Sequence, residues 1–336
     1  MLIDRKGRGR LFLFWAALSL TAFLLMIDPA GCAELVKGGL QTVVKRALPA
    51  VFPYLVLSSL LFESGFPQLF KGRAARLFGR LFHLPDCCVS GIVIGLFAGF
   101  PLGASYAAGL YAEGRCTKEE AERLSALSGF PAPPFLLGAF GQGVMGSALA
   151  GLLLYAVQTA AVFLYGILLG RSARKREKSR KREGAPPFLK KEEGKADPFE
   201  RKCTVPALFP MVGVCIGRSA LQMVRIGGYI LFFFLISGLI LDIFSPIFSL
   251  FPLLEGPVAG FFEISSGVAH INARGAQGML AGGLVLCFSG LSVHMQVAGF
   301  LVPAGLSVKE HLLAHLRLCP VIALLSAALC ALFDLF

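Results

Sequence analysis

The sequence predicts an all-α polytopic membrane protein built from two inverted-topology repeats with broken or re-entrant helices. Its composition is 56% hydrophobic and 15% charged, with a mean hydropathy of +0.72, whereas soluble proteins carry about 25% charged residues. The net charge of +12 comes from short basic segments between apolar runs. This is the pattern of cytoplasmic loops in membrane proteins, so we expect no nucleic-acid partner. A third observation is a pair of interrupted segments, one in each half.

The two interrupted segments, 128–138 and 289–299, are apolar but unsuited to a continuous helix. Three prolines in the first remove backbone donors and break any helix there. Both segments begin with Ser-Gly and end with Gly, at the same separation along the chain. Opened backbone at membrane depth is tolerated only where protein buries it or where it lines a cavity. Paired interruptions of this kind indicate a transporter with one midplane site between two repeats.

The first half of the chain begins with a basic segment and the apolar run 11–27, which we interpret as an uncleaved helix within residues 1–30. The first repeat is expected over residues 33–170. Its elements are an amphipathic segment at 34–46, a helix at 49–62, a basic interfacial helix at 68–82, a Gly/Pro-rich element within 91–112, a helix starting at the Thr117–Glu120 capping box, the segment 128–138 and a span at 149–169.

A basic stretch at 171–204 separates the halves. Thirteen Lys or Arg against six acidic residues between 171 and 202 predict a solvated cytoplasmic loop held by anionic lipid of the bilayer. The second, inverted repeat is expected over 205–336. Its elements are an amphipathic segment at 205–220, a span at 226–241, a Gly-rich element at 260–267 that corresponds to 95–103, the segment 289–299 and a span at 312–332.

Charge also predicts orientation. The basic N-terminus, the 71–80 segment and the 171–204 loop should be cytoplasmic, and the acidic exit at Glu113 external. The helix at 49–62 then enters from outside and the helix at 226–241 from inside. Two repeats inverted in this way can exchange conformations, as alternating access requires.

Backbone groups and small polar side chains of the interrupted elements are the predicted substrate ligands, because broken helices offer carbonyls, amides and helix ends to a polar solute. The predicted substrate-binding residues are Ser128, Gly129, Pro131, Pro134, Gly99, Pro101, Gly103, Ser265, Ser266, Asn272, Ser289, Gly290, Ser292, His294 and Gln296. For His294 a second interpretation stays open, a core histidine bonded to a backbone carbonyl.

Three charged residues stand out beside these elements. Glu263 follows apolar residues, and a charge at membrane depth is costly, so it is a candidate for binding a coupling proton or cation. The alternative is a salt bridge to Arg274 or Arg225. Those two arginines are themselves candidates for pairing with an anionic substrate, the alternative being contact with lipid phosphate.

Enzyme motifs and metal sites are not evident. His311 and His315 have the i, i+4 spacing of metal ligands, but the sequence shows no third ligand. Nine scattered cysteines form no CxxC pair and fit small core positions. No nucleophile elbow, P-loop, dinucleotide fingerprint or zinc-protease motif occurs. We therefore expect no metal, no cofactor and no catalysis, while an oligomer stays open.

The order of several short motifs carries a family resemblance. They are the segments 49–53, 99–104, 119–124, 128–129 and 290–296. Together, over about residues 40–318, they resemble the sporulation integral membrane proteins with nucleoside-recognition (Gate) domains. The resemblance implies a relation to concentrative nucleoside transporters, whose re-entrant hairpins and unwound helices form the substrate site. It also implies transport of dipicolinic acid across the outer forespore membrane. A nucleoside transporter and a non-transporting assembly factor for sporulation are the alternatives.

Overall fold

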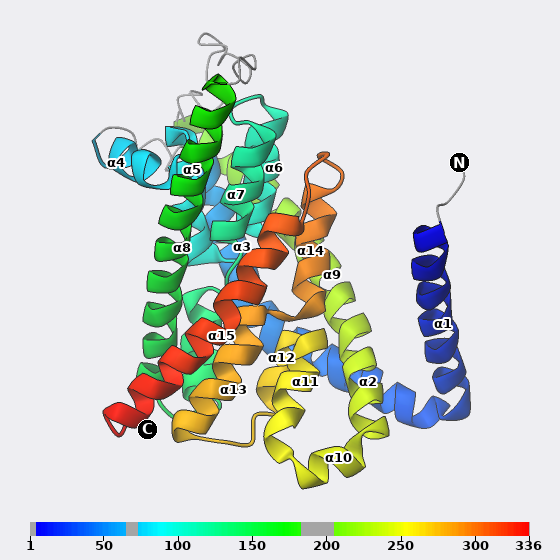
Figure 1. The fold of residues 1–336 in the computed structure, drawn as a ribbon. Helices are drawn as coiled ribbons and strands as arrows, with labels where there is room; N and C mark the ends of the chain where they lie inside the picture. Colours follow the sequence, from blue (N-terminus) through cyan, green and yellow to red (C-terminus); the bar gives the residue numbers. More distant parts are fainter. Residues whose placement is uncertain (1–4, 65–72, 183–204, 336) are drawn as a thin grey trace.

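The computed structural model describes residues 5–64, 73–182 and 205–335, and these residues contain helices but no strand (Figure 1). The prediction of an all-α protein is confirmed. Most of the basic stretch, from 183 to 204, and Lys71 lie outside the described residues.

The helices before the basic stretch are α1 (Arg5–Ile27), α2 (Pro29–Thr42), the π-helical η1 (Val43–Ala47), α3 (Leu48–Glu63), α4 (Arg73–Phe82), α5 (Asp86–Ala98), α6 (Leu102–Ala112), α7 (Lys118–Ser128), the π-helical η3 (Phe135–Gln142) and α8 (Ala148–Arg182). After it come α9 (Val205–Ile243), α10 (Ser245–Leu250), the 3-10 helix η5 (Pro252–Leu254), α11 (Glu255–Phe262), α12 (Ile264–Ala269), α13 (Gly275–Phe288), α14 (Gly290–Leu301) and α15 (Lys309–Leu332).

Four helical segments in the described parts are long and apolar enough to cross a membrane, namely 148–177, 209–243, 275–301 and 309–332, and two bent helix pairs raise the number to as many as six. They confirm the spans predicted at 149–169, 226–241 and 312–332. The segment 205–220, predicted to be amphipathic, is helical and continues into the span. That segment and the following span form one helix, α9, which contains Pro210 near its start.

A hairpin of α5 and α6 is the first broken element (Figure 1). Its tip turns at Gly99, with φ +63°, and at the cis Phe100–Pro101 bond. A Cβ atom at Gly99 would lie 2.6 Å from the carbonyl oxygen of Phe130, and one at Gly103 would overlap the carbonyl oxygen of Ser128. The hairpin tip therefore packs on the opened backbone that follows α7.

The second half repeats this packing with α11 and α12, which form a short hairpin whose tip is Glu263. The helix beside it breaks between α13 and α14, where Ser289 and Gly290 have φ values of +73° and +76°. A Cβ atom at Gly290 would lie 2.8 Å from the carbonyl oxygen of Gly260 on α11. Each half thus places a hairpin tip against the break of a longer helix.

The two hairpins lie toward opposite ends of the molecule. The α5–α6 hairpin shares one end with α4 and the last turns of α8, whereas α11 and α12 lie near the other end (Figure 1). Because α5 and α6 turn back at Gly99, the Glu113 exit is on the same side as the start of the basic stretch. Arg123 donates to the His83 carbonyl at 2.9 Å, and the His83 ring contacts Glu177 at 2.9 Å. The prediction that Glu113 faces the opposite side is wrong.

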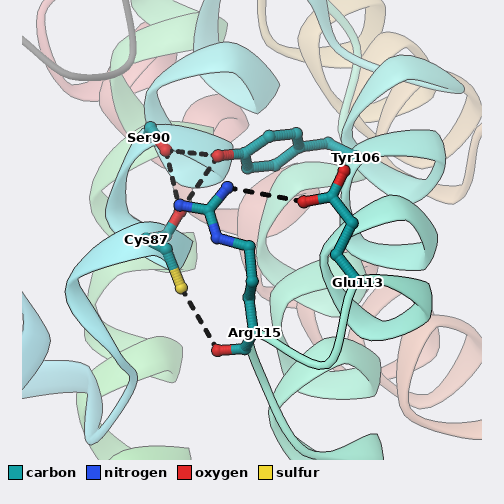
Figure 2. A network of polar contacts seen from close by, with 5 residues as sticks. All are labelled: Cys87, Ser90, Tyr106, Glu113 and Arg115. Atoms are coloured by element: carbon teal, nitrogen blue, oxygen red, sulfur yellow. Dashed lines mark hydrogen bonds and ion pairs between the residues drawn. The ribbon is translucent and has the colours of Figure 1, made fainter. Parts of the chain in front are cut away.

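A polar network fixes the base of the first hairpin, and Figure 2 shows its members. The Tyr106 hydroxyl on α6 lies 2.6 Å from Ser90 Oγ on α5 and donates to the Cys87 carbonyl at 3.1 Å. Arg115 and Glu113 form an ion pair of 3.5 Å in the loop after α6. Buried polar groups that are mutually satisfied in this way hold neighbouring helices in one arrangement.

Candidate functional site

A pocket of about 210 Å³ lies between the tip of the first hairpin, α9 and α14. Its lining residues are Pro101, Gln222, Arg225, Ile226, Tyr229, Gln296, Gly299 and Phe300. Three predicted site residues, Pro101, Arg225 and Gln296, come together here from three separate elements. Gln222 and Tyr229 were not predicted. Their signal in the sequence is a polar side chain within an apolar helix, which marks a candidate functional position.

The wall of the pocket that α9 contributes carries a positive charge and an amide donor that makes no hydrogen bond to any described residue. Arg225 is solvent-exposed, and the ion pairs of the described residues do not include it. The Nε2 atom of Gln222 is buried and has no hydrogen-bond partner in the part of the chain that the structure describes, a costly state for an amide donor. On the facing side, Gln296 on α14 donates from Nε2 to Ser292 Oγ at 3.3 Å. Such a wall offers a guanidinium and amides to a ligand that accepts hydrogen bonds.

Three imidazoles form a buried cluster beside the break in α13–α14. His294 comes from α14, and His311 and His315 come from α15. His294 Nδ1 lies 3.2 Å from His311 Nε2, and His315 Nδ1 lies 2.6 Å from the carbonyl oxygen of Cys287. His294 does not line the pocket. Its ring is buried, pairs with the His311 imidazole and lies beside the backbone carbonyl of Phe288, as the alternative of a core histidine predicts.

The cluster also contacts the interrupted segment of the first half. Phe130 stacks on His315 with ring centroids 4.2 Å apart, and a Cβ atom at Gly129 would lie 2.5 Å from His311 Cε1. Gln158 on α8 adds a link, because its Nε2 donates to the Pro131 carbonyl at 3.1 Å and its Oε1 lies 3.8 Å from Cys287 Sγ. Side chains of α8 and α15 therefore link the interrupted segment after α7 to the break between α13 and α14.

Several residues predicted to bind substrate instead pack a hairpin tip against the break of the neighbouring helix. Ser128 and Ser289 donate their hydroxyls to carbonyls of their own helices, at 2.8 and 2.9 Å. Gly99, Gly103 and Gly290 allow close backbone contact, as described above. These residues do not line the 210 Å³ pocket. Pro134 lines a smaller, mainly apolar pocket of about 50 Å³ on the Phe100 side of the hairpin tip.

Glu263 is fully buried at the tip of the second hairpin. Its Oε2 accepts from the Ser266 backbone N–H at 2.6 Å and so caps α12. Its Oε1 has no partner within hydrogen-bond distance among the described residues, and the N–H and hydroxyl of Ser265 lie near the carboxylate. Ser266 Oγ lies 2.9 Å from Ser237 Oγ, and Ser265 is buried beside it.

The salt bridge offered as an alternative role for Glu263 is absent from the described ion pairs. Arg225 lines the pocket. Arg274 is exposed at the start of α13, where its Nη1 would lie 3.8 Å from a Cβ atom at Gly146. Asn272 is exposed nearby and donates to Glu255 at 3.1 Å. Neither Arg274 nor Asn272 reaches the pocket.

Metal ligation does not fit the histidine cluster. Among the described residues no group of three or more His, Cys, Asp or Glu has the geometry to hold a metal ion. The reason is visible at His294 and His311, whose Nδ1 and Nε2 atoms face each other in a hydrogen bond rather than a common centre.

Comparison with known proteins agrees with the helical spans. The chain is 28% identical over 317 residues to the sporulation integral membrane protein YlbJ of Bacillus subtilis (strain 168), and the match covers 89% of this chain and 77% of the relative. This chain is a multi-pass membrane protein. No protein-family model matches it, and no solved structure does.

Proposed function

We propose that the protein is a membrane transporter of a small polar aromatic anion, dipicolinic acid during spore formation, working by alternating access at one site between two inverted repeats. The pocket beside the first hairpin tip carries this proposal, because it combines a free arginine, an unused amide donor and aromatic walls. The similarity to a sporulation integral membrane protein supports the biological setting. The family resemblance in the motifs supports the substrate.

The chemistry of dipicolinate fits this lining. It is a flat pyridine ring with two carboxylates, and a guanidinium can bind one carboxylate through two parallel hydrogen bonds. Arg225 supplies such a group, Gln222 an amide without a partner, and Tyr229 and Phe300 aromatic surface. A nucleoside would also use the amides but has no carboxylate for Arg225, and this favours the anion.

The arrangement of hairpins supports alternating access. We assign residues 33–170 and 205–336 to two Gate-like repeats, whose hairpins are α5–α6 and α11–α12 and whose broken crossing elements are α7–η3 and α13–α14. The hairpins lie toward opposite ends of the molecule (Figure 1), as inverted repeats require. Glu263, with one unpaired oxygen at the second tip, remains a candidate for a coupling cation. The basic stretch is expected to contact anionic lipid.

The test is the thermal stability of purified protein in detergent, titrated separately with dipicolinate and with nucleosides. A ligand at a hundred times its dissociation constant stabilises the folded state by about 2.7 kcal/mol. We expect a saturable shift with dipicolinate that Arg225→Gln abolishes. The matched control is Arg218→Gln, on the same helix, where the arginine pairs with Glu63 at 2.7 Å and does not line the pocket.

Other outcomes would redirect the proposal. A shift with nucleosides alone would assign the runner-up substrate. A dipicolinate shift that Arg225→Gln leaves unchanged would show that the pocket is not the binding site. No shift from either ligand, in protein shown to be folded and inactive in lipid vesicles, would favour a non-transporting assembly factor.

A further inference from the structure

Hydrogen-bond partners determine the protonation pattern of the histidine cluster. A nitrogen that faces a carbonyl oxygen must carry the proton. His315 Nδ1 faces the Cys287 carbonyl at 2.6 Å and His311 Nδ1 faces the Ser125 carbonyl at 3.4 Å, so both rings are protonated at Nδ1. The bare Nε2 of His311 then accepts from His294 Nδ1, 3.2 Å away. All three neutral rings therefore carry their proton on Nδ1.

This pattern leaves two lone pairs without a partner. Among the described residues, the buried Nε2 atoms of His294 and His315 have no partner within hydrogen-bond distance, although the backbone carbonyls of Phe288 and Gly129 lie near these two rings. Because both are bare nitrogens, what each lacks is a proton or a donor. A proton added at His294 Nε2 can be shared further, since the Nδ1 proton can pass along the 3.2 Å hydrogen bond to His311.

The groups around the cluster carry no opposite charge. Contacts reach Ser125 on α7 and Phe130 after it, Cys287 and Phe288 at the end of α13, and no Asp, Glu, Lys or Arg among the described residues acts electrostatically on the three rings. The titratable neighbours are the thiols of Cys287 and of Cys319, one turn beyond His315. A bound proton would therefore lack a counter-charge unless an anion binds nearby, because an isolated buried charge is costly.

With dipicolinate bound, the pocket would hold more negative than positive charge, which a proton on the histidine cluster could balance. Dipicolinate has two negative charges, and among the described residues that line the pocket Arg225 is the one cation. Gln296, on the pocket wall, and His294, in the cluster, are two residues apart on α14, so binding in the pocket and protonation of the cluster act on the same short helix.

We propose that the His294–His311–His315 cluster is a proton-binding site and that it takes up one proton with each anion bound in the pocket. This inference rests on the proposed transport function. In the balanced step, hydronium on one side of the membrane gives its proton to the bare Nε2 of His294 and leaves water. The imidazolium, shared with His311, offsets the second carboxylate, and the proton returns to water when the anion leaves on the other side.

The test is dipicolinate uptake into vesicles containing the purified protein, with and without an imposed pH difference. One coupled proton makes accumulation rise about tenfold for each pH unit. We expect this response in the wild type and its loss in His311→Gln and His294→Gln, both still stabilised by dipicolinate. The control is His270→Gln, a histidine outside the cluster that contacts the Ser266 carbonyl. The proposal is overturned if dipicolinate uptake by the wild type does not depend on the pH difference. It is also overturned if only Glu263→Gln abolishes that dependence.

A direct measurement separates this inference from the transport assignment. The chain has five histidines, so ¹⁵N NMR of histidine-labelled protein can distinguish bare, protonated and doubly protonated rings, with assignments from single variants. We expect an imidazolium signal from the cluster between pH 5 and 8 when dipicolinate is present. If dipicolinate neither binds nor crosses the membrane, the proposed function fails. If the three histidine rings stay neutral between pH 5 and 8, with or without dipicolinate, the proton-binding site is overturned.

Discussion

Replacing Gly103 by alanine tests the packing that positions the pocket. A Cβ atom there would overlap the carbonyl oxygen and hydroxyl of Ser128, and overpacking of this kind costs about 1–3 kcal/mol. Gly109 lies on the same helix, α6, where an added Cβ would meet no described atom within 4 Å apart from the surrounding backbone of α6 itself. Both substitutions gain the same helix propensity, about 1 kcal/mol. The two free energies of unfolding should therefore differ by the overpacking term alone, about 1–3 kcal/mol.

The assay is unfolding of each variant in mixed micelles by sodium dodecyl sulfate, followed by far-ultraviolet circular dichroism. Gly109→Ala should unfold at a higher detergent fraction than wild type, and Gly103→Ala at a lower fraction than Gly109→Ala. Gly103→Ala should also weaken dipicolinate binding, because the displaced hairpin carries Pro101 of the pocket wall. Equal unfolding curves for the two variants would refute the close contact between the hairpin and the break.

Three further changes test other parts of the fold in the same unfolding assay. Gln158→Leu should cost about 1–3 kcal/mol because it leaves the Pro131 carbonyl unpaired, whereas Gln277→Leu, at an exposed position, should stay within about 0.5 kcal/mol of wild type. Thr117→Ala should cost about 1 kcal/mol by removing the capping box of α7, with faster hydrogen exchange in its first turn; unchanged exchange would contradict this role. Tyr106→Phe should cost about 1 kcal/mol through its lost hydrogen bonds, and a neutral result would mean that the network in Figure 2 does not hold the hairpin.

Local chemistry made the main elements of this protein predictable. Apolar length gave the spans, the Thr117–Glu120 pair gave the start of α7, and glycine and proline density marked both hairpins and both breaks. These signals act within a few residues of the chain, so the sequence alone reveals them. The same reasoning failed at Glu113, because charge indicates a side of the membrane only if the preceding helices cross it, and α5 and α6 turn back instead.

The sequence by itself determined a helical membrane protein with paired broken elements and pointed to Pro101, Arg225 and Gln296 as site residues. Only the tertiary structure decided that these three share a pocket with Gln222, and that His294 meets His311 and His315. Spacing shows which side chains share a helix face, but contacts between α6, α9, α14 and α15 depend on how whole helices pack. For the same reason many predicted ligands proved to be packing residues, since a glycine that allows close approach looks the same in sequence whether a ligand or another helix approaches it.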